Sequence, residues 1–351
     1  MIGRLTVSVY DVPVEHPPES DGTARWSKTT LVVCEVGDGL GYTYADRGTA
    51  ALLSEVVGKA VEGISPFDPR KAREAARTAL RNHGEGGASA MALSALDLAL
   101  WDWKAKLLGV SLSKLLGKVR DRVPAYGSGG LTSYSEAQLR EQLGGWADRG
   151  FSAVKMKVGR EPARDLGRVR AAREAIGRQC QLFVDANGAY GVKEALRFAR
   201  AFDELGVTWF EEPVVKTNLD GLRLLREHAP MEIAGGEYGY EHSDFLALMP
   251  VLDVLQADAT RCGGITGFLA AHALCEAYEK PLSSHCAPSL HAALGCALPA
   301  FRHVEWFVDH VRIEEMLFDG APKPDGGNLV PSDAPGLGLV FKKQDVEKYR
   351  R

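Results

Sequence analysis

Acidic side chains recur at a fixed interval in the middle of this 351-residue chain. Asp185, Glu211 and Glu237 each follow a short apolar run, and 26 residues separate each of them from the next. A strand and the helix that follows it occupy about that length, so we expect the three carboxylates at one height on consecutive parallel strands. Converging carboxylates repel one another unless a cation lies between them, and ligands that are all oxygen favour Mg²⁺ over zinc. The spacing therefore predicts a magnesium site.

Other apolar runs in the same region also end in ionisable groups. The segment SAVKMKVG carries Lys155 and Lys157, whose spacing projects both side chains to the same side of a strand. Later runs end in Asp258, His285 and Glu305. One such residue alone is usually a helix cap or a solvated charge, and the two lysines alone could be solvated on an edge strand. Seven consecutive runs of this kind instead predict one shared catalytic site.

The elements that must position these residues are short strands separated mostly by amphipathic helices. The strand-like runs cover residues 123–129, 152–158, 181–187, 207–213, 231–237, 252–258, 280–286 and 303–308. Eight such runs that alternate with helical patterns favour a parallel barrel of the (β/α)₈ type. Catalytic residues of these barrels lie at the carboxyl ends of the strands, where the ionisable groups occur here.

Two further regions flank the predicted barrel. In residues 1–50, apolar and polar side chains alternate as in strands, which indicates an antiparallel meander. A polar loop at 14–27 interrupts it and is long enough to cover another part of the protein. Residues 50–120 show helical spacing of apolar side chains. The last segment, 325–351, is rich in Gly and Pro and then strand-like, so we expect it to fold back onto the first region.

The composition excludes several classes of function. A net charge of -4 argues against a nucleic-acid partner or a polybasic membrane surface. No run of apolar residues is long enough for a transmembrane helix, and the N-terminus resembles an amphipathic strand rather than an export signal. The six cysteines are scattered without CxxC spacing, which is typical of reduced thiols. We therefore expect a cytoplasmic protein.

Taken together, the motifs resemble those of the enolase superfamily, and within it the mandelate racemase group. They are KMK at 155–157, VDAN at 184–187, FEEP at 210–213, GGE at 235–237, DATRCGGITG at 258–267, SSH at 283–285 and VEW at 304–306. The resemblance covers essentially the whole chain. It implies an α/β fold with a modified TIM barrel, (β/α)₇β, at 121–324. It also implies an N-terminal α+β capping domain at 1–120, to which residues 325–351 return.

The resemblance assigns roles to the polar strand ends. It implies that Asp185, Glu211 and Glu237 bind Mg²⁺. It implies that Lys157 is one acid/base catalyst, and that His285 with Asp258 forms the other on the opposite face. Glu305 would lie near the enolate oxygen and Asn187 would contact substrate. It also implies a symmetric homo-oligomer, from dimer to octamer.

The family reaction removes a proton α to a carboxylate, which places a second negative charge on the carboxylate oxygens. Mg²⁺, the Lys155 ammonium and a protonated Glu305 can stabilise that charge. A lysine base must be partly neutral, and we expect Lys155 and the metal to lower the pKa of Lys157. Asp258 would fix the tautomer of His285.

Several outcomes of this chemistry remain open. If His285 protonates a leaving β-hydroxyl, an acid sugar (aldonate or aldarate) is dehydrated to a 2-keto-3-deoxy acid, the commoner outcome in the group. If His285 returns a proton to the opposite face, the enzyme is a racemase or epimerase of a 2-hydroxy acid or amino-acid derivative. A metal-binding barrel without catalytic activity is the remaining reading, although both bases are present.

Substrate specificity is expected in the polar loop and in a second loop near residues 42–46. His16, Trp26, Tyr44 and Arg261 are the candidates for binding the small-molecule carboxylate substrate, and each could equally be a packing or ion-pair residue. A diacid sugar would require a cation at its distal end. Arg25, Lys28 and Arg261 could supply that cation, and a mono-acid sugar, which needs none, fits as well.

Overall fold

Each of the eight strand-like runs forms a parallel strand in the computed structural model, which describes residues 1–351. The strands pair in the order β12-β11-β10-β9-β8-β7-β6-β13. Their bounds are β6 (Val123–Gly129), β7 (Ala153–Lys157), β8 (Gln181–Asp185), β9 (Val207–Glu211), β10 (Glu232–Gly235), β11 (Val254–Ala257), β12 (Leu282–Ser284) and β13 (Val304–Phe307). The amide of Arg302 donates to the Leu282 carbonyl at 2.8 Å, so the two end strands meet and nearly close a barrel.

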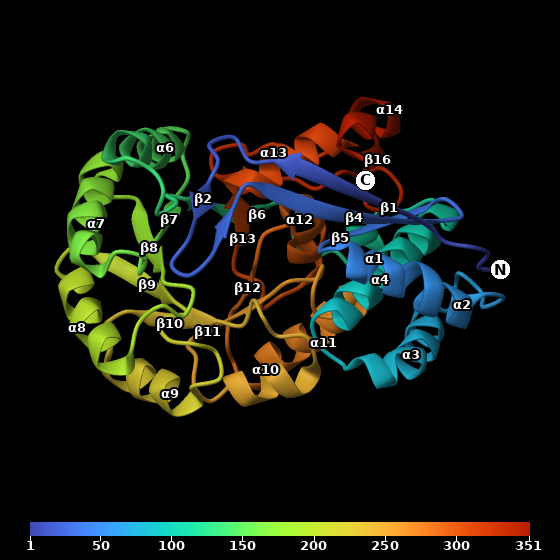
Figure 1. The fold of residues 1–351 in the computed structure, drawn as a ribbon, viewed down its shortest axis with the longest axis horizontal. Coiled ribbons are helices and arrows are strands. Elements are labelled where there is room, and N and C mark those ends of the chain that lie inside the picture. The colour runs from blue at the N-terminus through green and yellow to red at the C-terminus, as the bar shows by residue number, and fades with distance from the viewer.

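A helix follows each barrel strand and packs outside it (Figure 1). These helices are α6 (Glu136–Asp148), α7 (Pro162–Ile176), α8 (Val192–Asp203), α9 (Leu219–His228), α10 (His242–Leu248), α11 (Gly264–Ala277), α12 (Pro288–Ala297) and α13 (Val308–Leu317). The first of them begins at a capping box, in which Ser135 and Gln138 exchange hydrogen bonds. The last helix, α13, also contacts the N-terminal domain, because its Glu314 accepts a hydrogen bond from the Tyr42 hydroxyl at 2.9 Å.

Apolar and aromatic side chains fill the barrel below the polar strand ends. Phe183 stacks on Trp209 with a ring separation of 5.0 Å, and Tyr126 meets the ring of Phe183 edge-on. Asp185 comes two residues after Phe183, and Glu211 comes two residues after Trp209. Side chains two residues apart project to the same side of a strand, so both carboxylates also point into the barrel, one level above the aromatic rings. The aromatic layer therefore closes the bottom of the polar site.

The N-terminal domain, or cap, combines a three-stranded antiparallel sheet with helices. The sheet contains β1 (Thr6–Pro13), β4 (Lys28–Val36) and β5 (Gly39–Tyr44) in the order β1-β4-β5. The helices are α1 (Arg47–Ala51), the π-helical turn η1 (Leu52–Val57), α2 (Gly58–Val61), α3 (Pro69–Leu80), the 3₁₀ turn η2 (Arg81–His83), α4 (Ala88–Leu107) and α5 (Leu112–Leu115). The Ala-rich α4 packs closely on β5, because a Cβ at Gly41 would lie 2.1 Å from the carbonyl oxygen of Ala95.

Two small pieces connect the cap to the barrel. The polar loop between β1 and β4 forms a hairpin, β2 (Glu19–Ser20) with β3 (Arg25–Trp26), which reaches from the cap sheet across the barrel strands in Figure 1. The C-terminal segment contains β14 (Phe318–Asp319), β15 (Asn328–Leu329), β16 (Val340–Phe341), α14 (Lys343–Val346) and the turn η3 (Glu347–Tyr349). Its Arg351 amide donates to the Val9 carbonyl at 3.0 Å, so the chain end lies against β1 of the cap.

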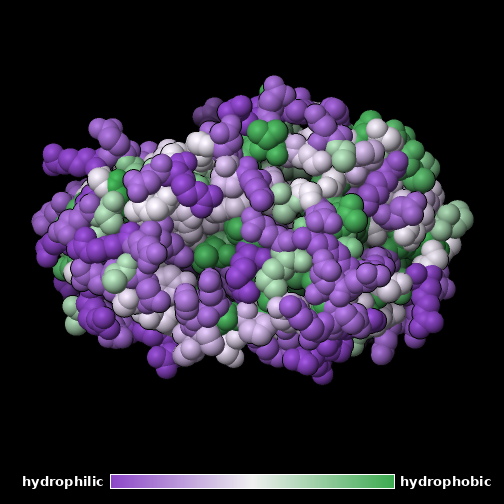
Figure 2. Space-filling model, turned by 90° about the horizontal axis from the view of Figure 1, so that it is seen from above, coloured by the Kyte–Doolittle hydropathy of each residue, from purple (hydrophilic) through white to green (hydrophobic).

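The molecular surface seen in Figure 2 is mostly hydrophilic, with small, separate groups of hydrophobic side chains. Among the helices of the structure, none combines the length and the apolar character that a membrane crossing requires. The cytoplasmic location expected from the thiols stays a prediction.

Candidate active site

The carboxyl ends of β8, β9 and β10 bring the three regularly spaced carboxylates together. One oxygen each from Asp185, Glu211 and Glu237 lies within 4.8 Å of the others. The side chains are 0%, 0% and 3% exposed. Glu237 reaches this position through Gly236, whose φ of 120° and whose 2.4 Å approach to the Gln256 carbonyl exclude a Cβ.

The charges of this acidic group are only partly balanced by protein. Burial and the neighbouring Asp185 raise the pKa of Glu211 well above its usual value. Burial also opposes ionisation of Asp185, but the ammonium groups of Lys157 and Lys155 lower its pKa further than burial raises it. The Oε2 atom of Glu237 is buried and has no hydrogen-bond partner. A group of three buried carboxylates with an unpartnered oxygen has the ligand chemistry of a magnesium site.

Lys155 lies in the barrel interior among carboxylates. Its Nζ is 2.5 Å from Glu211 and 2.8 Å from Glu305. Glu305 also accepts hydrogen bonds from the Ser128 hydroxyl at 2.6 Å and the Cys286 amide at 2.7 Å. Burial would raise the pKa of Glu305, but Lys155 holds it well below the usual range. The expectation of a protonated Glu305 was therefore wrong for this structure, because three donors surround the carboxylate and favour its charged form.

Lys157 contacts Asp185 at the adjacent strand end. Burial lowers the pKa of Lys157, and Lys155 lowers it as well, but the carboxylates around it, Asp185 first and then Glu237 and Glu211, together raise it above its usual value. The lowered pKa expected from sequence is thus not found in the metal-free chain. The physical reason is that the sequence shows the neighbouring cation two residues away but not the carboxylate across the β7–β8 pair.

His285 and Asp258 form the expected dyad. His285 Nδ1 is 2.8 Å from Asp258 Oδ2. The other oxygen of Asp258 accepts from both the amide and the hydroxyl of Thr260, each at 2.7 Å. Burial raises the pKa of Asp258, but the hydrogen bond from His285 and the positive charge around it, including Arg261, together lower it further, so the carboxylate is ionised. The ring must then donate from Nδ1, which leaves the Nε2 lone pair directed away from Asp258.

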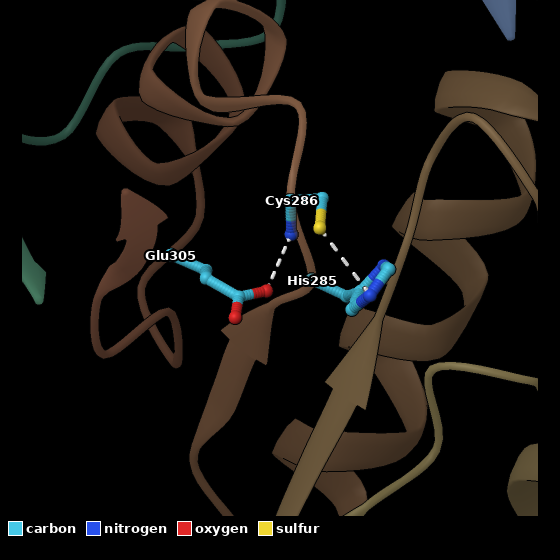
Figure 3. A group of neighbouring side chains, drawn as sticks. All are labelled: His285, Cys286 and Glu305. Atoms are coloured by element: carbon cyan, nitrogen blue, oxygen red, sulfur yellow. Dashed lines mark hydrogen bonds between the residues drawn. The ribbon is translucent and has the colours of Figure 1, made fainter. Parts of the chain in front are cut away.

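The residue after the dyad histidine connects it to β13. Figure 3 shows the Cys286 thiol directed at the His285 ring while the Cys286 amide is directed at the Glu305 carboxylate. The sulfur is 3.3 Å from His285 Nε2. Cys286 has a φ of 49°, a left-handed value that is unfavourable for a side chain other than glycine. The structure thus keeps a strained residue at this strand end, as it does at Asn187 and Glu212.

These groups surround one cavity of about 340 Å³ between the barrel and the cap. The cavity lining includes predicted catalytic, metal-binding and substrate-binding side chains: Trp26, Tyr44, Lys157, Asn187, Glu237, Arg261, His285 and Glu305. Lys155, Asp185, Glu211 and Asp258 do not line the cavity, but Lys155 contacts Glu305, Asp185 contacts Lys157 and Asp258 contacts His285, all of which do. Of the three candidate cations for a distal carboxylate, Lys28 and Arg261 line the cavity and Arg25 does not.

His16 does not belong to this site. It is exposed and lines a different hollow with Glu15 and Tyr134, on whose ring it packs edge-on. Its selection from sequence was wrong because the polar loop forms the β2–β3 hairpin, which directs Trp26 into the site cavity and leaves His16 outside.

Sequence reasoning missed several residues of the site. Ser128 at the end of β6 bonds Glu305, and His310 lines the cavity with its ring stacked on Tyr44 at 3.4 Å. Burial and the charge of His285 hold the pKa of His310 well below its usual value, so this ring is neutral. The signal for Ser128 was available, because β6 also ends in a polar residue. No local pattern marks His310, which enters from α13.

Family models match both parts of the chain. Residues 4–117 match the N-terminal domain of mandelate racemase and muconate lactonizing enzyme, and residues 138–346 match the enolase C-terminal domain-like family. The chain belongs to the mandelate racemase and muconate lactonizing enzyme family. The resemblance inferred from the strand-end motifs is thus confirmed, together with the barrel-and-cap fold.

Individual family members resemble the chain over most of its length. A mandelate racemase/muconate lactonizing enzyme-like protein from Rubrobacter xylanophilus superimposes with a TM-score of 0.97 and 47% identity, covering 100% of this chain and 99% of that one. L-talarate/galactarate dehydratase from Salmonella typhimurium is 32% identical over 91% of this chain and 82% of its own. A 3,6-anhydro-alpha-L-galactonate cycloisomerase from Streptomyces coelicolor is 32% identical over 100% of this chain and 99% of its own.

The functions named for the family members are related but not uniform. They are acid-sugar dehydratases and cycloisomerases, with an epimerase among them. The Salmonella dehydratase has a structure with Mg and L-lyxarohydroxamate bound. Magnesium and a small organic ligand are therefore bound together in that relative.

Proposed function

We propose that this chain is a Mg²⁺-dependent enzyme that removes the proton α to a carboxylate. Its preferred reaction would be that of a hydro-lyase, which dehydrates an acid sugar (aldonate or aldarate) to a 2-keto-3-deoxy acid. The observation that carries the proposal is that Lys157 and His285 line one cavity with Glu237. Lys157 is the last residue of β7, and His285 comes directly after β12. Around the barrel, β6 and β13 separate these two strands in one direction, and β8 to β11 separate them in the other. A substrate between the two bases would present opposite faces to them.

Asp185, Glu211 and Glu237 would hold the magnesium ion. They fit it because their oxygens converge within 4.8 Å and because the buried Glu237 Oε2 has no hydrogen-bond partner. When bound, Mg²⁺ supplies positive charge beside the substrate carboxylate, whose negative charge grows as the α proton leaves. Lys155, buried among Glu211 and Glu305, would add a fixed positive charge to the same region.

Lys157 would remove the α proton through its Nζ. It must be neutral to do so, and Asp185 is the carboxylate that contributes most to raising its pKa. Burial and Lys155 already act in the opposite direction, so engagement of Asp185 as a metal ligand would favour the neutral amine. Glu305, as an ionised group, would position Lys155 instead of donating a proton.

His285 would act on the opposite face. Asp258 holds the proton on Nδ1 and stabilises the ring when it is doubly protonated, so Nε2 can deliver a proton to the departing β-hydroxyl. Asn187, Arg261, Trp26 and Tyr44 line the cavity and would bind the remainder of the substrate. Arg261 is 3.7 Å from Asp258 and 3.8 Å from Glu237, so it would also fix the position of the dyad relative to Glu237.

The test is a screen of mono- and diacid sugars for keto-acid formation with Mg²⁺ present. We expect turnover of at least one acid sugar, and loss of turnover by at least about a hundredfold in Lys157→Ala and in His285→Ala, because general acid and base groups each contribute about that much or more. Both variants should still bind Mg²⁺ by calorimetry. Lys193→Ala, an exposed lysine on α8, is the matched control and should keep full activity. Near-normal turnover in both active-site variants would contradict the assignment.

A racemase or epimerase is the second candidate, because two bases on opposite faces can also invert a centre. Proton NMR in D₂O separates the two reactions. If deuterium enters the α carbon while the carbon skeleton stays intact and no keto acid forms, the enzyme is a racemase or epimerase and not a dehydratase. Neither turnover nor exchange would favour a binding protein without catalytic activity. The homo-oligomer implied by the resemblance stays a prediction.

A further inference from the structure

Three different metal-binding donors meet at the ends of β12 and β13. His285, Cys286 and Glu305 each offer one donor atom, and these atoms lie within 4.8 Å of one another (Figure 3). All three residues are buried, and all three line the site cavity. The donors are nitrogen, sulfur and oxygen, whereas the acidic group on β8 to β10 offers oxygen alone.

The His285 ring is already oriented as a metal ligand. Asp258 accepts the hydrogen bond from Nδ1 at 2.8 Å, and Thr260 fixes Asp258 in turn. A carboxylate behind a histidine is the arrangement that fixes the ring and raises the basicity of the coordinating nitrogen in zinc sites. The Nε2 lone pair therefore faces the cavity with its supporting group in place.

The separation of the donor atoms fits a tetrahedral zinc ion. Zinc bonds of about 2.3 Å to sulfur and about 2.0 to 2.1 Å to nitrogen place the two donors about 3.6 Å apart. Cys286 Sγ is 3.3 Å from His285 Nε2. Glu305 can complete a set of three, because one of its oxygens accepts only the Cys286 amide. The hydrogen bond between thiol and ring would thus be replaced by a shared metal.

We propose that His285, Cys286 and Glu305 form a second metal site, which binds one thiophilic divalent cation of the Zn²⁺ class and is separate in ligand chemistry from the magnesium site. Mixed nitrogen, sulfur and oxygen ligands select Zn²⁺, whereas Mg²⁺ prefers oxygen. Three protein ligands leave a fourth position, which faces the cavity as in zinc sites that keep a water or an external ligand.

Binding would break the S–H bond of Cys286, form a zinc–sulfur bond and release the proton to solvent. The nearby carboxylates Asp258 and Glu237 favour a cation here, and the Lys155 ammonium, 2.8 Å from Glu305, opposes it. Zinc on Nε2 would occupy the lone pair through which His285 exchanges protons. If the proposed function holds, Zn²⁺ therefore inhibits the enzyme even when Mg²⁺ is saturating.

The test measures Zn²⁺ binding directly and does not depend on activity. Full-length protein in saturating Mg²⁺ is titrated with Zn²⁺ in competition with a chromogenic chelator, and Co²⁺ is used as a spectroscopic probe. We expect one bound zinc per chain and a thiolate-to-cobalt charge-transfer band. In Cys286→Ser the band should disappear and the zinc affinity should fall at least about tenfold, because even supporting residues of metal sites contribute that much.

Cys262→Ser is the matched control, since Cys262 is also a buried thiol but is not one of the three donors. It should keep both the band and the affinity. His285→Ala is a second test of the same site and should weaken zinc binding while Mg²⁺ binding stays unchanged, so a folding defect in one variant does not decide the result. Zinc binding that excess Mg²⁺ abolishes, or a cobalt complex without a thiolate band, would overturn the proposal.

Discussion

At the scale of single residues, the site depends on pairing between charges that lie far apart in sequence. Lys155 on β7 pairs with Glu305 on β13, one strand beyond its neighbour β6, and Lys157 contacts Asp185 on the neighbouring strand. These contacts set the protonation states of the buried groups. Glu237 differs from Asp185 and Glu211, because its buried Oε2 has no hydrogen-bond partner and no lysine contacts it. Of the three carboxylates, Glu237 is therefore the one whose charge a bound cation would stabilise most.

We expect Glu237→Gln to weaken Mg²⁺ binding at least about tenfold, because the change removes a charged oxygen that no protein group satisfies. Isothermal titration of Mg²⁺ into the folded protein measures this effect without substrate. Glu232→Gln is the control, since Glu232 begins the same strand and pairs with Arg302 at 2.8 Å outside the site. Equal Mg²⁺ affinity in the two variants would remove Glu237 from the ligand set.

At the scale of elements, helix α13 connects the barrel to the cap through one buried carboxyl group. Glu314 accepts hydrogen bonds from the Tyr42 hydroxyl of β5 at 2.9 Å and from the Ser289 amide of α12 at 2.9 Å. Burial raises the pKa of Glu314 to about 7, although these hydrogen bonds lower it. The cap and two barrel helices thus share a group that changes charge near neutral pH.

Glu314 should make stability depend on pH. Its pKa is higher in the folded than in the unfolded chain, so its contribution is complete below the unfolded value of 4.5 and is lost as the pH rises through about 7. We expect the free energy of unfolding of the wild type, relative to Glu314→Gln, to fall by on the order of 3 kcal/mol between about pH 4 and about pH 8. Urea unfolding of both proteins across this range measures the difference. A difference that does not change with pH would show that the carboxyl group is not protonated in the folded protein.

At the scale of the whole molecule, the cap, the barrel and the C-terminal segment are packed as one unit. The largest cluster of buried apolar side chains includes Tyr42 of the cap together with barrel residues such as Ile265. Asp102 on α4 connects the cap to the C-terminal segment, because its carboxylate accepts from the amides of Leu40 and Leu337 at 2.8 and 2.6 Å and pairs with Lys106 at 2.7 Å. Loss of this carboxylate would leave two buried amides without partners.

Asp102→Ala should therefore lower the free energy of unfolding by about 3 kcal/mol, because each unsatisfied buried donor costs about 1 to 3 kcal/mol. It should also make the segment around Leu337 more susceptible to limited proteolysis. Lys106→Ala is the comparison, since it removes the partly exposed ion pair and an exposed hydrogen bond to the Asp38 carbonyl but leaves the two amide contacts, and it should cost less than about 1 kcal/mol. Similar losses in the two variants would mean that the ion pair, and not the amide contacts, provides the stability.

The sequence by itself determined the barrel and most of the ionisable residues at its polar end. Side chains two residues apart project to the same side of a strand, which places Lys155 with Lys157. The regular interval places Asp185, Glu211 and Glu237 at one height, so local geometry is enough to predict both groups. Tertiary structure alone decided the protonation states, because a pKa depends on partners that other strands supply. It also decided that His16 lies outside the cavity, and that Cys286 faces both His285 and Glu305. Those outcomes depend on how the β2–β3 hairpin and the turn after β12 direct their side chains, and no spacing in the sequence specifies either.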